Sequence, residues 1–487
     1  MKRPMFLFGF IAIVMTLSCF YHRKLSLILT VLTVISILII VFLDKKDYIL
    51  PAVLCFFIML NMLSVNARND RIALASKSVI HGKFVATEDM VHMDEYSSVK
   101  LKCLSADALP EGYNLSLLYY GEENIVAGDI VNLSVKLREP YKKDKEILYG
   151  EDIYFSGYIK EVNFRDGTDA VYSALGKIRR YIIRSDRKYL KGDTAGTLIA
   201  ITVGDKSYLS DELLSDVKTV GGSHMMAVSG FHLAILLGSI FTFINRFFKN
   251  KYLRFLFSFT SVIILIGVCG FTKSIIRAGL MYIIASAAPL FGRENDSLNS
   301  LGTAILLMLL VSPFAANSLA FKLSVMSTFA IIYVSQYFLG VLCSKLKITS
   351  KIIKSILGII FDTFFATLFT MPVAIKYFGS VSTVGIPVNL ALNLLVTAAL
   401  IFNALALIIP VFFGLLREIL FRMAGVFSKM SNVIISYFAK LPGASKELGE
   451  RAFFISSFII VITVILIDTL KYIKKRKGRS NADVSGV

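Results

Sequence analysis

The sequence predicts a polytopic α-helical membrane protein with a small β-barrel insert near its N-terminus, placed outside the cell. Of the 487 residues, 55% are hydrophobic and 18% are charged, whereas soluble domains average about 45–50% apolar and about 25% charged residues. The mean hydropathy of +0.68 agrees, because so much apolar surface cannot be hidden inside water-soluble cores. A stretch of about a hundred residues near the N-terminus differs, since it lacks long apolar runs and is β-patterned.

Three apolar stretches open the chain and predict three transmembrane helices within residues 1–65. They cover Met5–Phe20, Leu25–Leu43 and Ile49–Val65, and the second and third are long enough, or nearly so, to cross a hydrocarbon core of about 30 Å. The first resembles a secretory signal peptide, but a lipoprotein cleavage box would need leucine at Thr16, and further spans follow directly. We therefore expect it to be retained as a helix.

Residues 66–165 predict an extracellular OB-like β domain. Turn-forming stretches at 107–112 and 122–129 separate short β-patterned segments. Five short strands in this length suit a small barrel of the OB type. The expected strands are Val79–Thr87, Ser97–Ser105, Asn114–Tyr120, Asp129–Arg138 and Asp152–Phe164.

The charge of this domain does not favour DNA binding. Its 13 Lys and Arg against 16 Asp and Glu give a net charge of −3, whereas an OB barrel that grips a phosphate backbone normally has a positive groove. Tyrosines can stack on bases, but in a β-barrel they more often pack in the core or at the rim. The tyrosines concerned are Tyr96, Tyr113, Tyr119, Tyr120, Tyr154 and Tyr158.

Residues 166–192 predict a basic amphipathic helix, Tyr172–Leu190. Basic residues alternate with leucine and isoleucine along it, which is typical of a helix that lies on a membrane surface with its charges at the headgroups. The alternative is a strip that contacts phosphates near a pore mouth. The basic residues are Lys177, Arg179, Arg180, Arg184, Arg187 and Lys188.

Residues 193–473 predict a polytopic membrane core, followed by a basic cytoplasmic tail at 474–487. Clusters of Lys and Arg at 246–254, 345–354 and 474–477 lie in the cytoplasm by the positive-inside rule, which places the β domain outside the cell. The basic run at 22–24 then falls on the wrong side, so the first hairpin can be short or re-entrant. Residues 419–441 are amphipathic and can cross the membrane or lie at its surface. The expected spans are Met225–Ile244, Phe255–Phe271, Ile275–Phe291, Leu298–Val311, Leu319–Leu342, Ile356–Met371, Val384–Phe413 and Phe453–Lys471.

Polar residues near two histidines predict a lined pore or gate. Asp205 lies just upstream of a run that contains His224, Ser229 and His232. In a helix with about 100° per residue, the two histidines are about 80° apart and can face one cavity. A polar lining, a proton relay or a cation site explains this pattern, and helix capping with interhelical hydrogen bonding explains it equally well. Two histidines without further ligands do not favour zinc, and no cofactor is expected.

Lys273 and Arg277 are one helical turn apart and therefore lie on one face of a helix. Thr272 stands where a phosphate-binding loop needs glycine, so no nucleotide site is predicted. The two cations either face the helix bundle, where they can meet an anion such as a DNA phosphate, or anchor the helix at the interface by snorkelling.

Residues that interrupt later apolar segments are typical of channels and transporters, but also of passive kinks. They are Pro372, Gly385, Pro387, Asn389, Asn393 and Pro410.

These motifs, in this order, resemble the ComEC-type competence protein family, whose members are inner-membrane channels for transforming DNA. The most specific likeness is His224-Met-Met-Ala-Val-Ser-Gly-Phe-His232, which is similar to the family signature H-L-L-A-V-S-G-L-H. Further likenesses cover Leu198–Asp205, Ser274–Ala278, Ser312–Phe314, Phe321–Ser324, Phe378–Ser382 and Pro387–Asn389.

The likeness does not extend to the metallo-β-lactamase-like domain of many family members, which is proposed to degrade the non-transported strand. The metal motif His-x-His-x-Asp-His of that domain is absent, and the chain has five histidines in all. The family block F-Q-L-S reads Phe321-Lys322-Leu323-Ser324, and the paired cysteines of the insert are reduced to Cys103. The resemblance therefore implies neither a metal-dependent nuclease nor any other enzyme.

The resemblance implies a cell-membrane channel that passes single-stranded DNA inward during natural transformation. The expected partners are single-stranded DNA, membrane lipid, a DNA receptor, a cytoplasmic ATPase and a separate nuclease, and a homo-oligomer stays open. The alternatives are a transporter of a small or lipid-linked anion and an intramembrane hydrolase that uses Ser229 with His224 or His232. The residues expected to line the pore or gate are Asp205, His224, Ser229, His232, Arg277 and Lys273.

Overall fold

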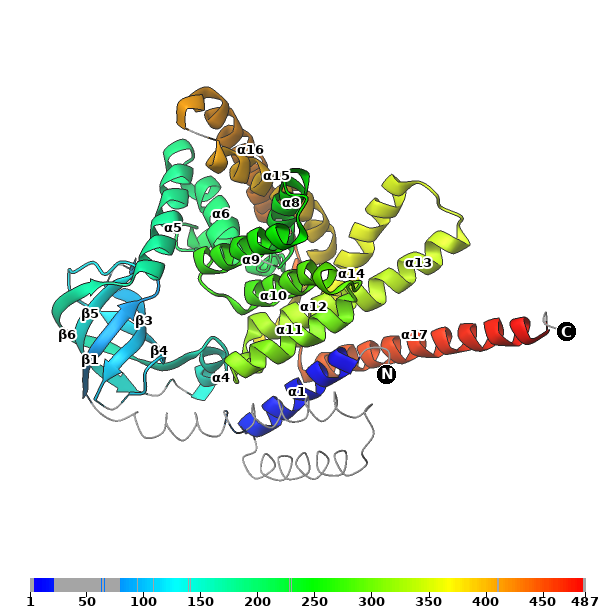
Figure 1. Cartoon of the computed structure of the whole chain (residues 1–487), viewed down its shortest axis with the longest axis horizontal. Coiled ribbons are helices and arrows are strands. Elements are labelled where there is room, and N and C mark those ends of the chain that lie inside the picture. Colours follow the sequence, from blue (N-terminus) through cyan, green and yellow to red (C-terminus); the bar gives the residue numbers. More distant parts are fainter. Residues whose placement is uncertain are drawn as a thin grey trace. The chain divides into compact units, whose positions relative to one another are not determined.

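The computed structural model describes residues 4–21, 63, 65 and 79–484, except for 94, 108, 139, 141, 227, 229 and 410. The described chain forms two compact units, whose elements are labelled in Figure 1. The expected spans Leu25–Leu43 and Ile49–Val65 lie outside the described residues, apart from 63 and 65. The first unit comprises Met1–Ser210, Met226–Lys322 and Thr397–Lys429, and the second comprises Asp211–Met225, Leu323–Val396 and Met430–Val487.

The β domain of the first unit is a six-stranded sheet whose strand pairing returns to its first strand. The pairing runs from β1 to β5, β6, β4 and β3, and β3 also pairs with β1; only β4 and β6 are parallel among these pairs. This arrangement fits an OB-like insert, as predicted; its place outside the cell stays a prediction. The short edge strand β2 and the helix α4 (Lys142–Gly150) were not predicted. The strands are β1 (Val79–Ala86), β2 (Val91–His92), β3 (Ser97–Ala106), β4 (Asn114–Tyr119), β5 (Asp129–Arg138) and β6 (Ile153–Thr168).

Apolar side chains on alternate strand positions fill the interior of this sheet. The tyrosines divide between the core and the surface: Tyr113 and Tyr154 are 7% and 2% exposed, whereas Tyr120 and Tyr158 are 66% and 39% exposed. Tyr113 and Tyr154 thus pack in the core, and Tyr96 and Tyr119 are half-buried. The fully buried side chains include Phe84, Leu101, Leu115, Leu133 and Phe155.

Helix α5 (Ala170–Tyr189) connects the β domain to the helices that follow it in the chain. Its N-cap is Asp169, whose carboxylate accepts hydrogen bonds from the backbone N–H groups of Val171 and Tyr172, both at 3.0 Å. A β-domain turn lies directly against the first turn of α5, since a Cβ on Gly128 would lie 2.6 Å from the backbone nitrogen of Ser173. Gly128 has φ +95°, so only glycine fits this contact without strain.

A bundle of α8 (Gly230–Phe247), α9 (Lys251–Val268) and α10 (Lys273–Ala287) forms the helical core of the first unit. Its buried apolar residues include Leu233, Val262, Ile266 and Ile275. The remaining elements of this unit are α6 (Gly192–Val203), η2 (Ala288–Phe291), α11 (Ser297–Val311) and η3 (Ala315–Asn317).

Helix α1 (Pro4–Tyr21) packs against α11 through a pair of glycines. A Cβ on Gly9 would lie 2.8 Å from the carbonyl oxygen of Gly302 and 2.9 Å from its Cα. Small residues at such a crossing let two backbones approach closely, which is a common way for helices to associate in membranes.

The second unit contains a π-helical turn, η4 (Ala330–Ser335), between α12 (Leu319–Phe329) and α13 (Gln336–Lys345). Its residues Tyr333 and Ser335 donate hydrogen bonds to carboxylates of two other helices, Asp468 in α17 and Asp362 in α14 respectively. Apolar packing surrounds these contacts. The remaining elements of the second unit are α7 (Asp211–Thr219), α14 (Lys351–Phe378), β7 (Ser380–Ser382), β8 (Ser445–Glu447) and α17 (Glu450–Val484).

Two predicted interruptions of apolar segments are wrong. Helix α14 continues through Pro372, and Pro387 lies in the first turn of α15 (Gly385–Ile408), where a missing N–H removes no helical hydrogen bond. Pro410 lies outside the described residues. The chain then continues through η5 (Val411–Phe413) to α16 (Gly414–Ala439).

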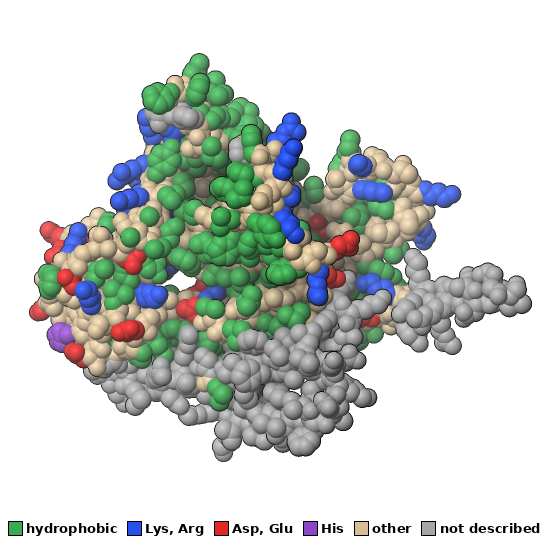
Figure 2. All heavy atoms as spheres, in the orientation of Figure 1, with side chains coloured by type: hydrophobic (Ala, Val, Ile, Leu, Met, Phe, Trp, Pro, Cys, Tyr) green, Lys and Arg blue, Asp and Glu red, His purple; other side chains and the backbone are tan. Residues whose placement is uncertain are grey.

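Among the described residues, seven helices are long and apolar enough to cross a membrane. In Figure 2, hydrophobic side chains cover much of the visible surface of the helices, whereas acidic and basic side chains mix on the β domain. The protein is therefore a polytopic membrane protein. The seven stretches are Lys251–Val268, Lys273–Phe291, Leu319–Lys345, Lys351–Phe378, Gly385–Ile408, Gly414–Ala439 and Glu450–Lys471.

Candidate functional site at the junction of the β domain and the helices

Three of the motif segments converge in the first unit. Gly204, with φ +82°, ends α6, and a Cβ on it would lie 3.5 Å from a methyl group of Val228 and 3.6 Å from the carbonyl oxygen of Cys269. A Cβ on Gly230, the first residue of α8, would lie 2.7 Å from the guanidinium of Arg277. The turn after α6, the start of α8 and the start of α10 are therefore neighbours.

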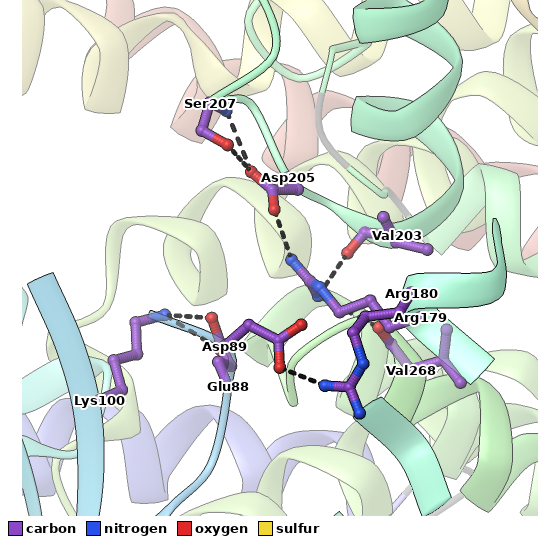
Figure 3. A network of polar contacts seen from close by, with 9 residues as sticks. All are labelled: Glu88, Asp89, Lys100, Arg179, Arg180, Val203, Asp205, Ser207 and Val268. Atoms are coloured by element: carbon purple, nitrogen blue, oxygen red, sulfur yellow. Dashed lines mark hydrogen bonds and ion pairs between the residues drawn. The ribbon is translucent and has the colours of Figure 1, made fainter. Parts of the chain in front are cut away.

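Arg179 of α5 ties two of these segments together (Figure 3). Its guanidinium donates hydrogen bonds to the carbonyl oxygens of Val203 at 3.0 Å and Val268 at 3.2 Å, and to Asp205 at 3.2 Å. The two carbonyls lie at the C-terminal ends of α6 and α9, where a cation is favoured by the helix dipole. The basic residues of this helix were expected to face lipid headgroups. The side chain of Arg179 is 12% exposed, so it points into the protein instead.

Asp205 is held on both of its carboxylate oxygens. One oxygen accepts from Arg179, and the other accepts from the backbone N–H of Ser207 at 3.0 Å and from its hydroxyl at 2.6 Å. The carboxylate therefore fixes the turn after α6 in this structure. Its role in lining a pore stays a prediction.

The acidic loop between β1 and β2 faces α5. Asp89 accepts from the guanidinium of Arg180 at 2.5 Å and from the backbone N–H of Ala127 at 2.9 Å. Glu88 pairs with Lys100 at 3.1 Å, as Figure 3 shows. Arg179 thus points into the helical core, whereas Arg180, the next residue of the same helix, points toward the β domain.

Lys273 makes a second connection between the β domain and the helices. Its ammonium group pairs with Asp152, at the start of β6, and donates to the hydroxyl of Ser312 at 3.0 Å. The same carboxylate accepts from Ser312 at 2.5 Å and from the hydroxyl of Tyr154 at 2.9 Å. Lys273 is 4% exposed, so its charge is balanced inside the protein.

Two further acidic residues of the β domain bind the helices beside Asp152. Glu146 pairs with Lys322 at 2.7 Å, and Glu151 accepts from the hydroxyl of Ser318. Part of the negative charge that disfavoured DNA binding therefore lies at the contact with the helices. Asp89, Glu146 and Asp152 each pair with a cation of α5, α10 or α12, which leaves the free surface of the domain less acidic than the sequence suggests.

Burial distinguishes between the two interpretations of Lys273 and Arg277. Their exposed fractions are 4% and 5%, so both cations face the protein, and the interfacial-anchor alternative is wrong. Arg277 packs over Gly230 and lies 3.2 Å from the sulfur of Met281.

The structure does not bring the two histidines together on one helix. His232 is fully buried in α8, but α8 begins at Gly230, so the angle calculated for a continuous helix does not apply to His224. His224 is exposed and belongs to the second unit. Ser229 lies outside the described residues. No group of three metal-binding side chains occurs in the part of the chain that the structure describes.

Cys103, in β3, is buried and chemically protected. Burial and, to a smaller extent, the nearby charge of Glu111 raise the pKa of its thiol to about 11. The thiol therefore stays protonated at neutral pH, which makes it a poor nucleophile. Among the described residues it forms no disulfide.

We expect the Arg179→Gln variant to lose about 2–3 kcal/mol of stability, because three partly buried acceptors lose a charged donor. A drop in the apparent Tm of the detergent-solubilised protein measures this loss. Arg184→Gln, an exposed position on the same helix, is the control and should leave the Tm nearly unchanged. Equal effects of the two variants would contradict the inward contact of Arg179.

Comparison with known proteins places most of these helices in one family. A sequence profile described as "Competence protein" matches residues 201–472, more than half of the chain. The chain is also 23% identical over 338 residues to ComE operon protein 3 of Bacillus subtilis (strain 168), an alignment that covers 68% of this chain and 41% of that protein. The chain thus spans about two fifths of the length of this curated relative. No solved structure matches it.

Proposed function

Because the chain belongs to the competence protein family, we propose that it is a cell-membrane channel that passes single-stranded DNA inward during natural transformation. The observation that carries this proposal is the extent of the family match. Residues 201–472 begin within α6 and reach α17, and they include all seven of the apolar helices found among the described residues. The β domain would lie outside the cell and the C-terminus in the cytoplasm.

The buried cations of α10 support a path for an anionic strand. A charge inside a helical bundle acts through a low dielectric and attracts phosphate groups more strongly than an exposed charge does. Arg277 is the first candidate for contact with DNA, because its side chain is 5% exposed and lies against Gly230, within the signature segment His224–His232. His232 in α8 is the second candidate, since it is buried in the helix whose first residue packs against Arg277.

The surface of the β domain offers a place for the strand to arrive. Tyr158 and Phe164 on β6 are 39% and 57% exposed, and the ammonium group of Lys136 lies 5.9 Å from the centre of the Tyr158 ring. Exposed aromatic rings beside cations suit the stacking of bases and the attraction of phosphates.

The chain itself performs no covalent chemistry in this proposal. A cytoplasmic ATPase would supply energy, and a receptor and a separate nuclease would act before the strand enters the channel.

The test is uptake of labelled DNA into a nuclease-resistant form in a competent host. We expect a deletion strain to lose uptake and Arg277→Gln or His232→Ala to lower it at least about tenfold, the effect of losing one strong polar contact. Arg422→Gln serves as the control, because its side chain is 74% exposed on α16. Protein in the membrane must be equal in all strains.

Each outcome of this experiment has a separate meaning. Loss of uptake in the deletion strain alone would keep the channel and exclude Arg277 and His232 from the path. Undiminished uptake in the deletion strain would exclude the channel. In that case flux of a small or lipid-linked anion would become the activity to measure.

A further inference from the structure

A cluster of buried polar side chains joins α5 to α6 and α15, and none of its members belongs to the site described above. Asp186 of α5 and Asn403 of α15 are both 0% exposed, and Thr202 of α6 is 9% exposed. The amide nitrogen of Asn403 donates to the hydroxyl oxygen of Thr202 at 3.2 Å and to Oδ2 of Asp186 at 3.5 Å. Asn403 thus links its own helix, α15, to α5 and α6.

Two oxygen atoms of this cluster have no hydrogen-bond donor among the described residues. They are Oδ1 of Asp186 and Oδ1 of Asn403. An ionised carboxylate can only accept hydrogen bonds. An ionised Asp186 would therefore leave its own Oδ1 and Oδ1 of Asn403 without a donor in a fully buried site. Buried polar groups without a partner are rare and costly.

One proton would provide the missing donor. A neutral carboxylic acid gains an O–H group. Because Nδ2 of Asn403 already donates to Oδ2 of Asp186, an O–H on Oδ1 of Asp186 can donate to Oδ1 of Asn403. This reciprocal pairing is that of a carboxylic acid with an amide, and it uses both of the oxygens that otherwise have no donor.

The groups beside Asp186 on α6 and α15 carry no positive charge that would balance its ionised form. Thr202 and Asn403 are neutral, and on the far side of Thr202 its carbonyl oxygen accepts from the thiol of Cys269 at 3.4 Å. In the described part of the chain, Asp186 forms no ion pair with any cation within 4.0 Å. Burial, which outweighs the hydrogen bond from Asn403, raises the pKa of Asp186 to about 8.

The cation that α16 presents to the same stretch of α5 is bound to other groups. Arg417 is 5% exposed and donates to the hydroxyls of Tyr181 at 2.9 Å and Ser185 at 3.1 Å. Its guanidinium also lies between aromatic rings. These rings belong to Tyr181, Tyr189 and Phe421, at 5.7, 5.9 and 5.5 Å from the guanidinium carbon.

We propose that Asp186 and Asn403 form a proton-binding site inside the helical core, in which a bound proton holds α5 against α15 at neutral pH. Loss of the proton at alkaline pH would put an unpaired charge between these helices and loosen α5. Since α5 connects the β domain to the helices, proton binding would set how firmly the two are joined. This inference does not depend on the proposed transport of DNA.

The sign of the pH dependence follows from the direction of the pKa shift. The folded protein binds this proton more tightly than the unfolded chain does, because the ordinary pKa of the carboxyl is 3.8. The stability that the proton contributes is therefore complete below the ordinary pKa of 3.8, decreases as the pH rises above it, and is lost once the pH passes about 8.

Infrared spectroscopy of the 487-residue chain in lipid nanodiscs tests the site directly. We expect a carboxylic-acid C=O band at neutral pH that fades with a midpoint near pH 8, and that is missing in Asp186→Asn. Asp193→Asn is the matched control, because Asp193 accepts hydrogen bonds from Ser210 in an exposed position, and it should retain the band. Identical spectra of the wild-type protein and Asp186→Asn at neutral pH would overturn the proposal.

A measurement of the apparent Tm against pH separates proton binding from simple packing. The contribution of Asp186 to the wild-type Tm should fall as the pH rises toward about 8 and level off above it, and Asp186→Asn should lose most of this fall. Ser185→Ala, which removes a neutral partner of Arg417 on the same helix, should lower the Tm equally at all pH values. If Asp186→Asn does not fold, the infrared titration of wild-type protein labelled with 13C-aspartate decides, and the lack of an acid band that titrates near pH 8 refutes the site.

Discussion

Replacing Lys273 by methionine is expected to lower the free energy of unfolding by about 3 kcal/mol and to release the β domain from the helices. The side chain of Lys273 is 6% exposed and that of Asp152 is 24% exposed, so the variant leaves a carboxylate without its cation in a partly buried place. Breaking a buried pair costs about 3–5 kcal/mol, and the remaining access of water to Asp152 places this case at the lower end. The apparent Tm and limited proteolysis between β6 and α5 measure the two effects.

A double-mutant cycle identifies the pair as the cause. Asp152→Asn should also destabilise the protein, but the combination with Lys273→Met should cost clearly less than the sum of the two single changes. The control is the pair of Lys440 and Glu212, whose side chains are 69% and 76% exposed. Lys440→Met should change the stability by less than about 1 kcal/mol. Additive effects of the Lys273 and Asp152 changes would show that the two side chains do not interact.

Replacing Gly302 by leucine is expected to separate α1 from α11. A Cβ at this position would overlap the carbonyl group of Met5 and lie 2.5 Å from the Cα of Phe6, so the contact is with backbone and no side-chain rotation relieves it. We expect a loss of about 3 kcal/mol, the upper part of the usual range for overpacking. Hydrogen exchange of the α1 peptide should rise at the same time.

The control for this change is another helical glycine with free space. A Cβ on Gly340 of α13 would meet no atom within 4 Å, so Gly340→Leu should leave both the Tm and the exchange of α1 unchanged. Normal exchange of α1 in Gly302→Leu would mean that the two helices do not cross at these glycines.

The elements of the fold follow from local patterns, and the sequence therefore predicted most of them. Alternating apolar residues predicted the main strands, and long apolar runs predicted six of the seven described helices that can span a membrane. The seventh, Gly414–Ala439, had been left open, and the expected spans Met225–Ile244 and Leu298–Val311 are not among the seven. The errors arose where a local rule was taken too far. Proline was expected to interrupt a helix at position 372, but α14 continues through it, because neighbouring helices in a membrane can satisfy the backbone groups that a proline frees. One helix was also assumed to run from His224 to His232, although α8 begins at Gly230.

The contacts of the candidate site could not be predicted, because they join residues far apart in the chain. Asp152 and Lys273 are 121 positions apart, and Glu146 and Lys322 are 176 positions apart. A single sequence gives no signal for such pairs. Arg179 was noticed only as one charge of an amphipathic helix, and hydrophobic periodicity cannot tell which charges of such a helix turn inward. The roles of Asp205, His224, Ser229, His232, Arg277 and Lys273 in a pore stay predictions.

The ion pairs between the β domain and the helices also mean that the insert is not a separable module. Lys273, Lys322 and Arg180 have carboxylates of the β domain as partners, so a shortened protein without this domain would contain three cations that have lost their counter-charges. The same holds for grafting, because a β domain from a distant relative would have to bring acidic residues at the same three places. Exchange of this domain between proteins is therefore constrained by electrostatics, even where the strands themselves tolerate variation.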